Sequence, residues 1–540
     1  MPLNIHAEAL EYLRKESLDI YNRIHSIQED IAFVESVREA YPTLTFLPNL
    51  RCGAWYTNPA HSSNEPAYFK STDGHYNNWG FNLRRPNLHL ITVASRTNGL
   101  ILVDSTRAGK RIPDALSKTV PIWCAVINRA IRLRHSHRQS EASSDQTSEM
   151  WDSALYTPPG VISPQEHMQI EGRLDKWAEE LAASSYTLPD IPYPLRPLWI
   201  TPATRTFPSV PLQSSSSLSS DDSVTPMYIP IICVSASRQV QEGIERRSQG
   251  FSYVQGSGDD HELWGMGLTP DLFWKHGSTL LDASRQDLEG IVRRIVTEAS
   301  TSSSRGNRKN PPSRIAKVDG RILVCSIEDL PVDMSSSSML PHDDIPSDRD
   351  TAFLIISPPP LSSQSASSSA PLPEQATNTN LTLGSRSSTP PQPKILHLYL
   401  DSGKKGQHSF LHSVLPQSLD FISSHLAQDR RQQGEEEGVY RGRDVCIACE
   451  SGKDASVGVA VAALQILFDD EGRYRGAESD GLVGGRIGTE TAATKQSIRR
   501  RLEWIIASRP QANPSRTTLK RVNDFLLSSQ SQISMFRRTI

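Results

Sequence analysis

Long hydrophobic runs, paired cysteines and an excess of one charge are all missing from this sequence. The longest apolar run, at 457–468, is too short to cross a bilayer, and the charged N-terminus lacks the apolar core of a signal peptide. Six cysteines in 540 residues form no disulfide framework, and Cys446 and Cys449 have no second pair with which to bind zinc. The balance of 57 Lys and Arg against 60 Asp and Glu excludes a globally basic nucleic-acid binder. We therefore expect a soluble cytoplasmic protein with no membrane and no DNA partner.

Ser- and Pro-rich segments divide the chain. Such compositions cannot bury enough apolar area to offset the entropy lost on ordering. We interpret 136–150 and 212–224 as surface insertions, and 301–393 as a mostly disordered linker with one strand near 321–328. This predicts an N-terminal domain over 1–300 and a C-terminal domain over 394–540.

Apolar spacing indicates the secondary structure. It predicts one or two amphipathic helices over 9–41, and two strands at 88–94 and 100–105 joined by an Asn-Gly hairpin turn. In the C-terminal part, the expected strands are 395–401 and 444–449, and the expected helices are 414–428, 456–470, 491–508 and 515–527. Alternating strands and helices predict an α/β fold with a mostly parallel sheet flanked by helices.

The run DVCIACESGKDASVGVAVAAL at 444–464 predicts a strand, a glycine-containing loop and a helix. Backbone N–H groups at a helix start form a natural phosphate cradle. The run resembles the phosphate loop of dual-specificity phosphatases, His-Cys-x-x-Gly-x-x-Arg-Ser/Thr, but Ala448 and Ala455 replace its histidine and arginine. Without that arginine we expect phosphate binding without hydrolysis, the alternative being an ordinary strand–turn–helix connection. The residues expected to bind are Cys449, Ser451, Gly452, Lys453, Asp454 and Ser456.

Two further loops combine hydroxyls, glycine and cations, as a phosphate or pyrophosphate site requires. The first follows the strand that ends at Asp104 and contains Ser105, Thr106, Arg107, Gly109, Lys110 and Arg111. The second contains Lys70, Ser71, Thr72, Asp73, Gly74 and His75. The aromatic residues after it, Tyr76, Trp79 and Phe81, suit either base stacking or core packing.

Acidic residues in a glycine-rich segment suggest a metal site. Asp259 and Asp260 lie beside glycines within 253–274, and adjacent carboxylates of this kind could hold Mg²⁺. Capping or turn roles are an equally good interpretation of these residues.

Positive charge is concentrated between residues 84 and 138, where eleven Lys and Arg face two Asp. A local excess of this kind is the footprint expected for a polyanion, although a solvated charged face is the usual alternative. The cations predicted to bind RNA are Arg84, Arg85, Arg129 and Arg132, with Arg499 and Arg500 near the C-terminus.

Five motifs together resemble the initiator tRNA phosphoribosyl transferase family of fungi and plants. They are RCGAWY at 51–56, FKSTDGH, DSTRAGKRIPDALSKTVPIWC, QGSGDDHELW and CESGKDASVGVA. The resemblance implies a family-specific N-terminal α/β domain and a phosphatase-like C-terminal domain. It also implies transfer of a ribosyl phosphate from 5-phosphoribosyl 1-pyrophosphate, with Mg²⁺, to the 2′-OH of a T-stem adenosine in initiator tRNA, which excludes that tRNA from elongation.

Such a transfer needs a group that takes the proton of the 2′-OH. Our candidates for base or metal contact are Asp104, Asp73 and His75, in that order. The rival hypothesis is a catalytically inactive phosphatase-like module that binds RNA or a phosphoprotein. The loop DSTRAGKR, which is additional to the phosphatase-like loop, favours the transferase because a pure binding module does not require it.

Overall fold

The computed structural model describes residues 3–50, 52–107, 109–139, 151–210, 227–302, 311–330, 350–359, 394–427, 443–475 and 493–528. The chain forms two compact units, Met1–Gly306 and Asn307–Ile540, called here the N-terminal and C-terminal units. Within the described residues, no helix combines the length and the apolar character needed to span a membrane.

The N-terminal unit is built on a four-stranded parallel sheet in the order β1-β2-β4-β3. Its strands are β1 (Thr45–Pro48), β2 (Leu100–Asp104), β3 (Leu195–Ile200) and β4 (Ile229–Ser235). Every residue of β2 and β4 is buried, as expected for central strands covered on both faces. The helix α2 (Ile20–Ala40) packs its isoleucines and valines on one face, against Ile101 and Val234 among others.

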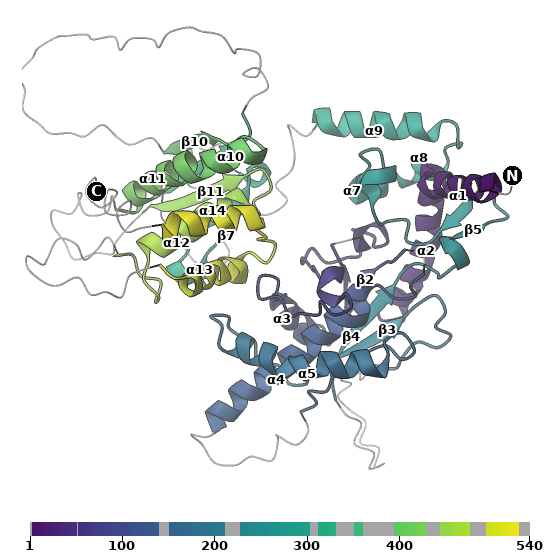
Figure 1. Ribbon diagram of the computed structural model, residues 1–540, viewed down its shortest axis with the longest axis horizontal. Coiled ribbons are helices and arrows are strands. Elements are labelled where there is room, and N and C mark those ends of the chain that lie inside the picture. Colours follow the sequence, from purple (N-terminus) through teal and green to yellow (C-terminus); the bar gives the residue numbers. More distant parts are fainter. Residues whose placement is uncertain are drawn as a thin grey trace, which may run out of the picture. The chain divides into compact units, whose positions relative to one another are not determined.

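The opposite side of this sheet carries α4 (Val120–Gln139), which packs against β3 and lies beside α5 (Pro164–Ala182) (Figure 1). A π-helical turn, Ala115–Thr119, leads directly into α4. The other elements of the unit are α1 (Leu3–Leu18), α3 (His89–Arg96), the hairpin β5 (Ile244–Arg246) and β6 (Ser252–Val254), α6 (His261–Trp264), α7 (Pro270–Lys275), α8 (Gly277–Leu281) and α9 (Leu288–Ser302). The predicted N-terminal helices are confirmed as α1 and α2.

The segment 88–94 is a helix, so the predicted strand there is wrong. In α3, Leu90, Ile91, Val93 and Ala94 lie at helical spacing and are buried together. Asn98 adopts φ of 57° and ends this helix, so the Asn-Gly pair acts as a helix terminator and not as a hairpin turn.

The C-terminal unit contains a five-stranded sheet in the order β10-β9-β11-β8-β7. Its strands are β7 (Ser313–Arg314), β8 (Ile322–Ser326), β9 (Thr351–Ser357), β10 (Ile395–Tyr399) and β11 (Asp444–Cys449). All neighbours pair in parallel except β7, which is antiparallel to β8. Two helices pack on the sheet, α11 (Leu415–Ala427), which α10 (Gly403–Ser409) precedes, and α12 (Ala455–Leu467). Two further helices, α13 (Lys495–Ser508) and α14 (Arg516–Leu527), pack on α12. The mostly parallel α/β architecture predicted for this part is confirmed.

The compact C-terminal unit begins before residue 394, where the sequence predicts the boundary of the C-terminal domain. Both β8 and β9 come from the predicted linker, yet β9 lies between β10 and β11 and is buried over Thr351–Ile356. The strand expected near 321–328 is present as β8, as part of the C-terminal sheet. Most of the predicted insertions and the rest of the linker fall outside the described residues; the first insertion begins inside α4, which runs to Gln139.

Candidate functional site

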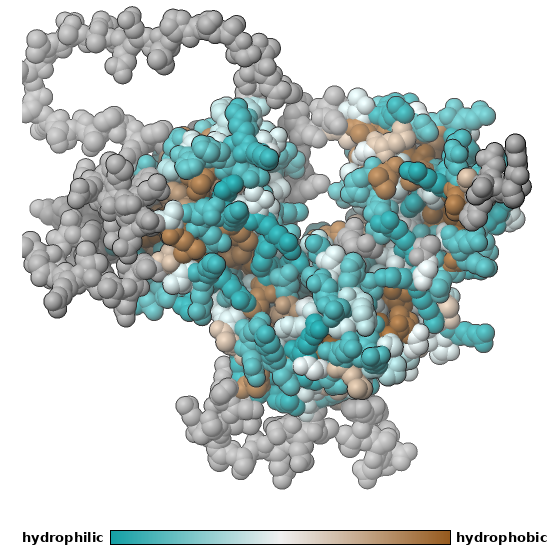
Figure 2. Space-filling view, viewed as in Figure 1, coloured by the Kyte–Doolittle hydropathy of each residue, from teal (hydrophilic) through white to brown (hydrophobic). Residues whose placement is uncertain are grey.

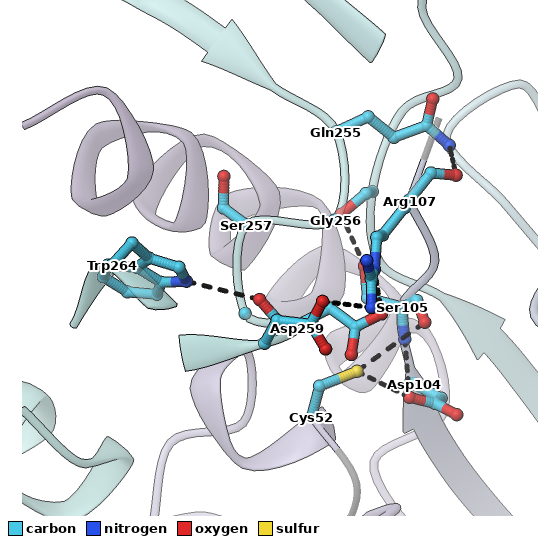
Figure 3. Close-up of polar contacts among 12 residues, drawn as sticks. Cys52, Asp104, Ser105, Arg107, Gln255, Gly256, Ser257, Asp259 and Trp264 are labelled. Atoms are coloured by element: carbon cyan, nitrogen blue, oxygen red, sulfur yellow. Dashed lines mark hydrogen bonds and ion pairs between the residues drawn. The ribbon is translucent and has the colours of Figure 1, made fainter. Parts of the chain in front are cut away.

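The carboxyl ends of β1, β2 and β4 meet at one edge of the N-terminal sheet, where ligands of parallel α/β sheets bind. Residues 105–111 follow β2, and residues 255–260 lie against them (Figure 3). Gln255 Nε2 donates to the carbonyls of Arg107 and Lys110, at 3.1 and 2.7 Å. Gly256 has φ of +71°, and a Cβ there would lie 2.6 Å from the Thr106 carbonyl oxygen, so only glycine allows this contact.

Asp104 anchors the loops after β1 and β2. It is fully buried, and its carboxylate accepts hydrogen bonds from Asn49 Nδ2, Cys52 Sγ and the Ser105 N–H, each at 2.8 Å. Its position beneath the surface corrects the expectation that it is the first candidate for contact with substrate. Asn49 and Cys52 were not predicted, because the strand that ends before them is only four residues long.

Arg107 projects from the loop after β2 and is 59% exposed. Its Nε lies 3.1 Å from Asp259 Oδ2, and it also forms an ion pair with Asp260. The Asp259 carbonyl accepts a hydrogen bond from Trp264 Nε1 at 3.3 Å, which fixes the acidic turn (Figure 3). The two residues predicted to hold Mg²⁺ therefore position a cation of the anion loop.

A buried hydrogen-bonded chain lies below this loop. Ser105 Oγ is 2.6 Å from Ser237 Oγ, and Ser237 Oγ donates to Asp30 Oδ2 at 2.6 Å. Tyr253 OH donates to Asp30 Oδ1 at 2.7 Å. Burial raises the pKa of Asp30 to about 8, against its ordinary value of 3.8. The chain ties the loops after β2 and β4 to α2 and β6.

The second predicted anion loop, Lys70–His75, borders the same edge. Asn49 exchanges two hydrogen bonds of 2.9 Å with the backbone of Phe69, and Thr119 Oγ1 donates to the Lys70 carbonyl at 3.1 Å. Gly74 packs against the Asp114 carbonyl too closely to carry a side chain. The structure thus brings together the loops predicted at 70–75, 104–111 and 255–260.

Within this second loop, the two candidate bases differ in access. Asp73 forms an ion pair with Arg85 at 2.9 Å, whereas His75 is 52% exposed and its Nε2 lies 3.7 Å from Asp114 Oδ2. Ser71 and Thr72 lie in a short 3-10 turn that ends at Gly74.

A cluster of charges joins this loop to the first. Asp114 contacts Lys110 Nζ at 2.5 Å and Lys118 Nζ at 3.0 Å, and Lys118 also contacts Glu166 at 3.1 Å. Burial alone would raise the pKa of Asp114, but the hydrogen bonds from Lys110 and Lys118 outweigh it, and the pKa lies below its ordinary value. Glu166 on α5 was not predicted, because it lies far from these loops in sequence.

The predicted RNA-binding cations fall into two groups. Arg129 is only 12% exposed and pairs with Asp175 at 2.8 Å and Glu171 at 3.5 Å, and Arg85 pairs with Asp73, so carboxylates already engage these two predicted RNA-binding cations. Arg132 is exposed on α4, and Arg84 is half-buried. Around α4 and α5, hydrophilic side chains cover most of the face shown in Figure 2. In the C-terminal unit, Arg499 pairs with Glu503 and Arg500 with Asp470.

The phosphatase-like loop of the C-terminal unit connects β11 to α12, as predicted. Cys449 is buried, and its Sγ lies 3.0 Å from Ser456 Oγ in the first turn of α12. Gly452 has φ of +62° and packs against the backbone of Ser326. Ser451 and Lys453 are exposed, while Asp454 accepts a hydrogen bond from the Ser515 N–H at 2.8 Å.

An arginine that the motif could not reveal supports this loop. Arg509, at the end of α13, is buried and donates from Nε to the Gly452 carbonyl at 2.8 Å and from Nη1 to the Val324 carbonyl at 3.3 Å. Burial lowers the pKa of its guanidinium. Because these donors hold backbone carbonyls, Arg509 stabilises the loop from behind and does not replace the missing phosphate-binding arginine.

The molecule therefore combines an α/β unit that has anion loops at its sheet edge with a phosphatase-like unit that lacks the catalytic histidine and arginine. Two family models match it: the Rit1 N-terminal domain over residues 13–297, and the Rit1 DUSP-like domain over 394–526. The chain is 31% identical to the tRNA A64-2′-O-ribosylphosphate transferase of Saccharomyces cerevisiae, over 95% of this chain and 93% of that protein. The chain belongs to the Rit1 family.

Two further proteins are similar over shorter stretches. An uncharacterized protein of Schizosaccharomyces pombe is 38% identical over 307 residues, which span 56% of this chain and 61% of that protein. The Yvh1 phosphatase domain from Chaetomium thermophilum is 24% identical over 24% of this chain and 62% of that chain, with a TM-score of 0.16.

Proposed function

We propose that this protein transfers a ribosyl phosphate from 5-phosphoribosyl 1-pyrophosphate to the 2′-OH of adenosine 64 in initiator tRNA. The observation that carries the proposal is the 31% identity to a tRNA A64-2′-O-ribosylphosphate transferase over 95% of this chain. The convergence of three polar loops at the sheet edge supports it, since the donor has two anionic groups to bind.

The donor would bind at the loop after β2. Arg107, Lys110 and Arg111 are exposed there, and Thr106 adds a hydroxyl beneath them. In the reaction, the 2′-oxygen attacks C1 of the donor ribose, and the bond from C1 to the diphosphate oxygen breaks with its electron pair. Cations placed at the departing diphosphate stabilise the charge that develops on it.

With the donor bound, the acidic turn would share its carboxylates between Arg107 and a magnesium ion that the donor carries. The carboxylates of Asp259 and Asp260 supply the oxygen ligands that Mg²⁺ prefers. The described residues contain no cluster of three or more His, Cys, Asp or Glu that could hold a metal, so the diphosphate would have to complete the coordination. Bound there, Mg²⁺ would add positive charge opposite the leaving group.

His75 is the best-placed group to take the proton of the 2′-OH. It is exposed beside the Asp114 carboxylate that also meets Lys110, whereas Asp104 is buried and Asp73 is paired with Arg85. An imidazole nitrogen can accept a proton from a hydroxyl within hydrogen-bond distance, which suits a general base.

Incubation of the protein with ribose-labelled 5-phosphoribosyl 1-pyrophosphate and initiator tRNA tests the proposal. We expect label in the RNA, and none when adenosine 64 carries a 2′-O-methyl group. If label enters the methylated tRNA equally, the acceptor atom is wrong. Tight tRNA binding without transfer would favour the inactive binding module.

A further inference from the structure

Tyr76 differs from the other aromatic residues of the second anion loop in its exposure. Its side chain is 68% exposed, whereas Trp79, three residues later, is 4% exposed. The alternative of core packing therefore holds for Trp79 and fails for Tyr76. An aromatic ring left in water gives up the free energy that burial would provide, and such residues are common where a partner covers them.

The loop that carries Tyr76 is held in place by its own hydrogen bonds. Asn77 adopts φ of 59°, Asn78 Nδ2 donates to the Thr72 carbonyl at 2.8 Å, and the Gly80 N–H donates to the Asp73 carbonyl at 3.0 Å. A ring held on a fixed loop loses little conformational entropy when a ligand covers it.

Trp79 supports the ring from below. The Tyr76 and Trp79 rings meet edge to face, with centroids 5.4 Å apart and planes at 79°. Trp79 Nε1 donates to Glu166 Oε1 at 3.0 Å, and the Arg173 guanidinium lies 4.9 Å from the Trp79 ring centroid. The indole is thus fixed between α5 and the Tyr76 loop.

Tyr76 lies next to the candidate site and near two cations. The Lys110 side chain meets the same Asp114 carboxylate that His75 approaches, and the Arg173 guanidinium lies against the Trp79 ring that contacts Tyr76. Exposed aromatic rings among cations bind single-stranded nucleic acid by base stacking, while the cations contact phosphates.

We infer that Tyr76 is a stacking residue for an exposed nucleobase of the RNA substrate. This inference rests on the proposed function, which takes tRNA as the acceptor. Bases inside an A-form stem stack on one another, so the base that covers Tyr76 would come from a loop or the end of a stem. By stacking on that base, Tyr76 would select the RNAs whose acceptor 2′-OH reaches the neighbouring donor loop.

The test measures the affinity of initiator tRNA for the Tyr76→Ala, Tyr76→Phe and Tyr76→Trp variants without donor. Loss of one stacked base should weaken the alanine variant about 5- to 150-fold. The phenylalanine and tryptophan variants should retain affinity close to that of the wild type. Because stacking releases no counterions, the salt dependence of binding should stay unchanged in all three variants.

Tyr12 on α1 is also exposed and provides the matched control, so Tyr12→Ala should bind tRNA as the wild type does. In the transfer assay, Tyr76→Ala should raise KM for tRNA and leave KM for the donor unchanged. Unaltered tRNA affinity in Tyr76→Ala would overturn the inference, even if transfer occurs, and would leave a protein partner as the occupant. Weak binding by Tyr76→Phe would also overturn it, because the hydroxyl and not the ring would then make the contact. Absence of transfer by the wild type would defeat the proposed function alone, since the binding measurement needs no donor.

Discussion

At the scale of single residues, Arg107 is both exposed and held in one orientation. Its guanidinium is more than half exposed, yet it is oriented by Asp259 and Asp260. An arginine held in this way presents donors to an incoming anion at a small cost in side-chain entropy.

Replacing Arg107 should therefore impair use of the donor. We expect Arg107→Ala to lower kcat/KM for 5-phosphoribosyl 1-pyrophosphate by about 10- to 150-fold, the value of one charge-assisted contact. Arg246 on β5 is also exposed, and Arg246→Ala is the control, expected to behave as the wild type. Equal losses in both variants would show a general charge effect in place of a donor contact.

Asp30 should make the stability of the protein depend on pH. Because its pKa in the folded state is about 8, above the ordinary 3.8, the folded protein keeps a proton that the unfolded chain has released. This group therefore lowers the free energy of unfolding progressively as pH rises from about 4 to about 8. Urea unfolding at pH 6 and pH 8.5 should show a smaller difference for Asp30→Asn than for the wild type. The same difference in both proteins would mean that other groups control the pH dependence.

The sequence could predict some of these residues and not others. Ser105 to Arg111 follow a plainly apolar strand, so their place at a sheet edge was expected. Asn49, Cys52 and Asp30 carry no such signal, since their partners come from elements distant in sequence and a single polar residue in a helix has many uses.

At the scale of elements, the β11–α12 connection is held by contacts from two directions. Its Cys449 and Ser456 side chains meet, while Arg509, at the end of α13, binds the carbonyl of Gly452. We expect Arg509→Ala to lower the free energy of unfolding of the C-terminal unit by about 1–3 kcal/mol, because buried carbonyls lose their donors.

The thiol of Cys449 should be dispensable. Cys449→Ser should leave transfer activity largely intact, and neither the wild type nor this variant should hydrolyse an aryl phosphate. Hydrolysis that Cys449→Ser abolishes would instead identify the thiol as a nucleophile.

The central position of β9 predicts which deletions the C-terminal unit tolerates. Deleting 336–392 would remove a buried strand from between β10 and β11, so we expect insoluble protein or a C-terminal unit without a cooperative thermal transition. Deleting only 366–388 removes sequence rich in Ser, Thr and Ala and leaves enough chain to return along β9. This shorter deletion should melt as the wild type does in circular dichroism, and its failure would show that the removed sequence contributes to the fold.

Element type was predictable wherever a long apolar pattern had one interpretation. The segments that became β11 and α12 were of that kind. Residues 88–94 were not, because a short apolar run fits a strand or a buried helix face, and the following Asn-Gly serves either a turn or a helix end. Thr351–Ser357 was missed because its seven residues stand between segments of low complexity.

At the scale of the whole molecule, charge counted along the chain differs from charge presented at the surface. The excess between 84 and 138 is partly neutralised by carboxylates of α5, which lie outside that window. The sequence motifs predicted the family because their residue types are those that its chemistry requires. A count of charges along the chain does not show which cations form ion pairs with carboxylates in the folded protein.

This difference can be measured in the salt dependence of tRNA binding. Arg132→Gln, at an exposed position on α4, should reduce the slope of log K against log salt by about one unit if it contacts a phosphate. Arg129→Gln should leave the slope unchanged and lower the thermal stability, because Arg129 is occupied by Glu171 and Asp175. A reduced slope for Arg129→Gln would show that its ion pairs open on binding.

The order of strands in the C-terminal sheet also has a consequence for how the chain is made. β8 and β9 emerge from the ribosome before β10 and β11, but they do not pair with each other, because β11 lies between them. More than a hundred residues separate β8 from β11, so each early strand keeps an open edge until the chain has been synthesised almost to its end. Open apolar edges are sites of association between chains, and late long-range pairing is slow. We therefore expect the nascent C-terminal unit to be prone to association until β11 is made, and a premature stop before residue 444 leaves two strands whose common partner is never made.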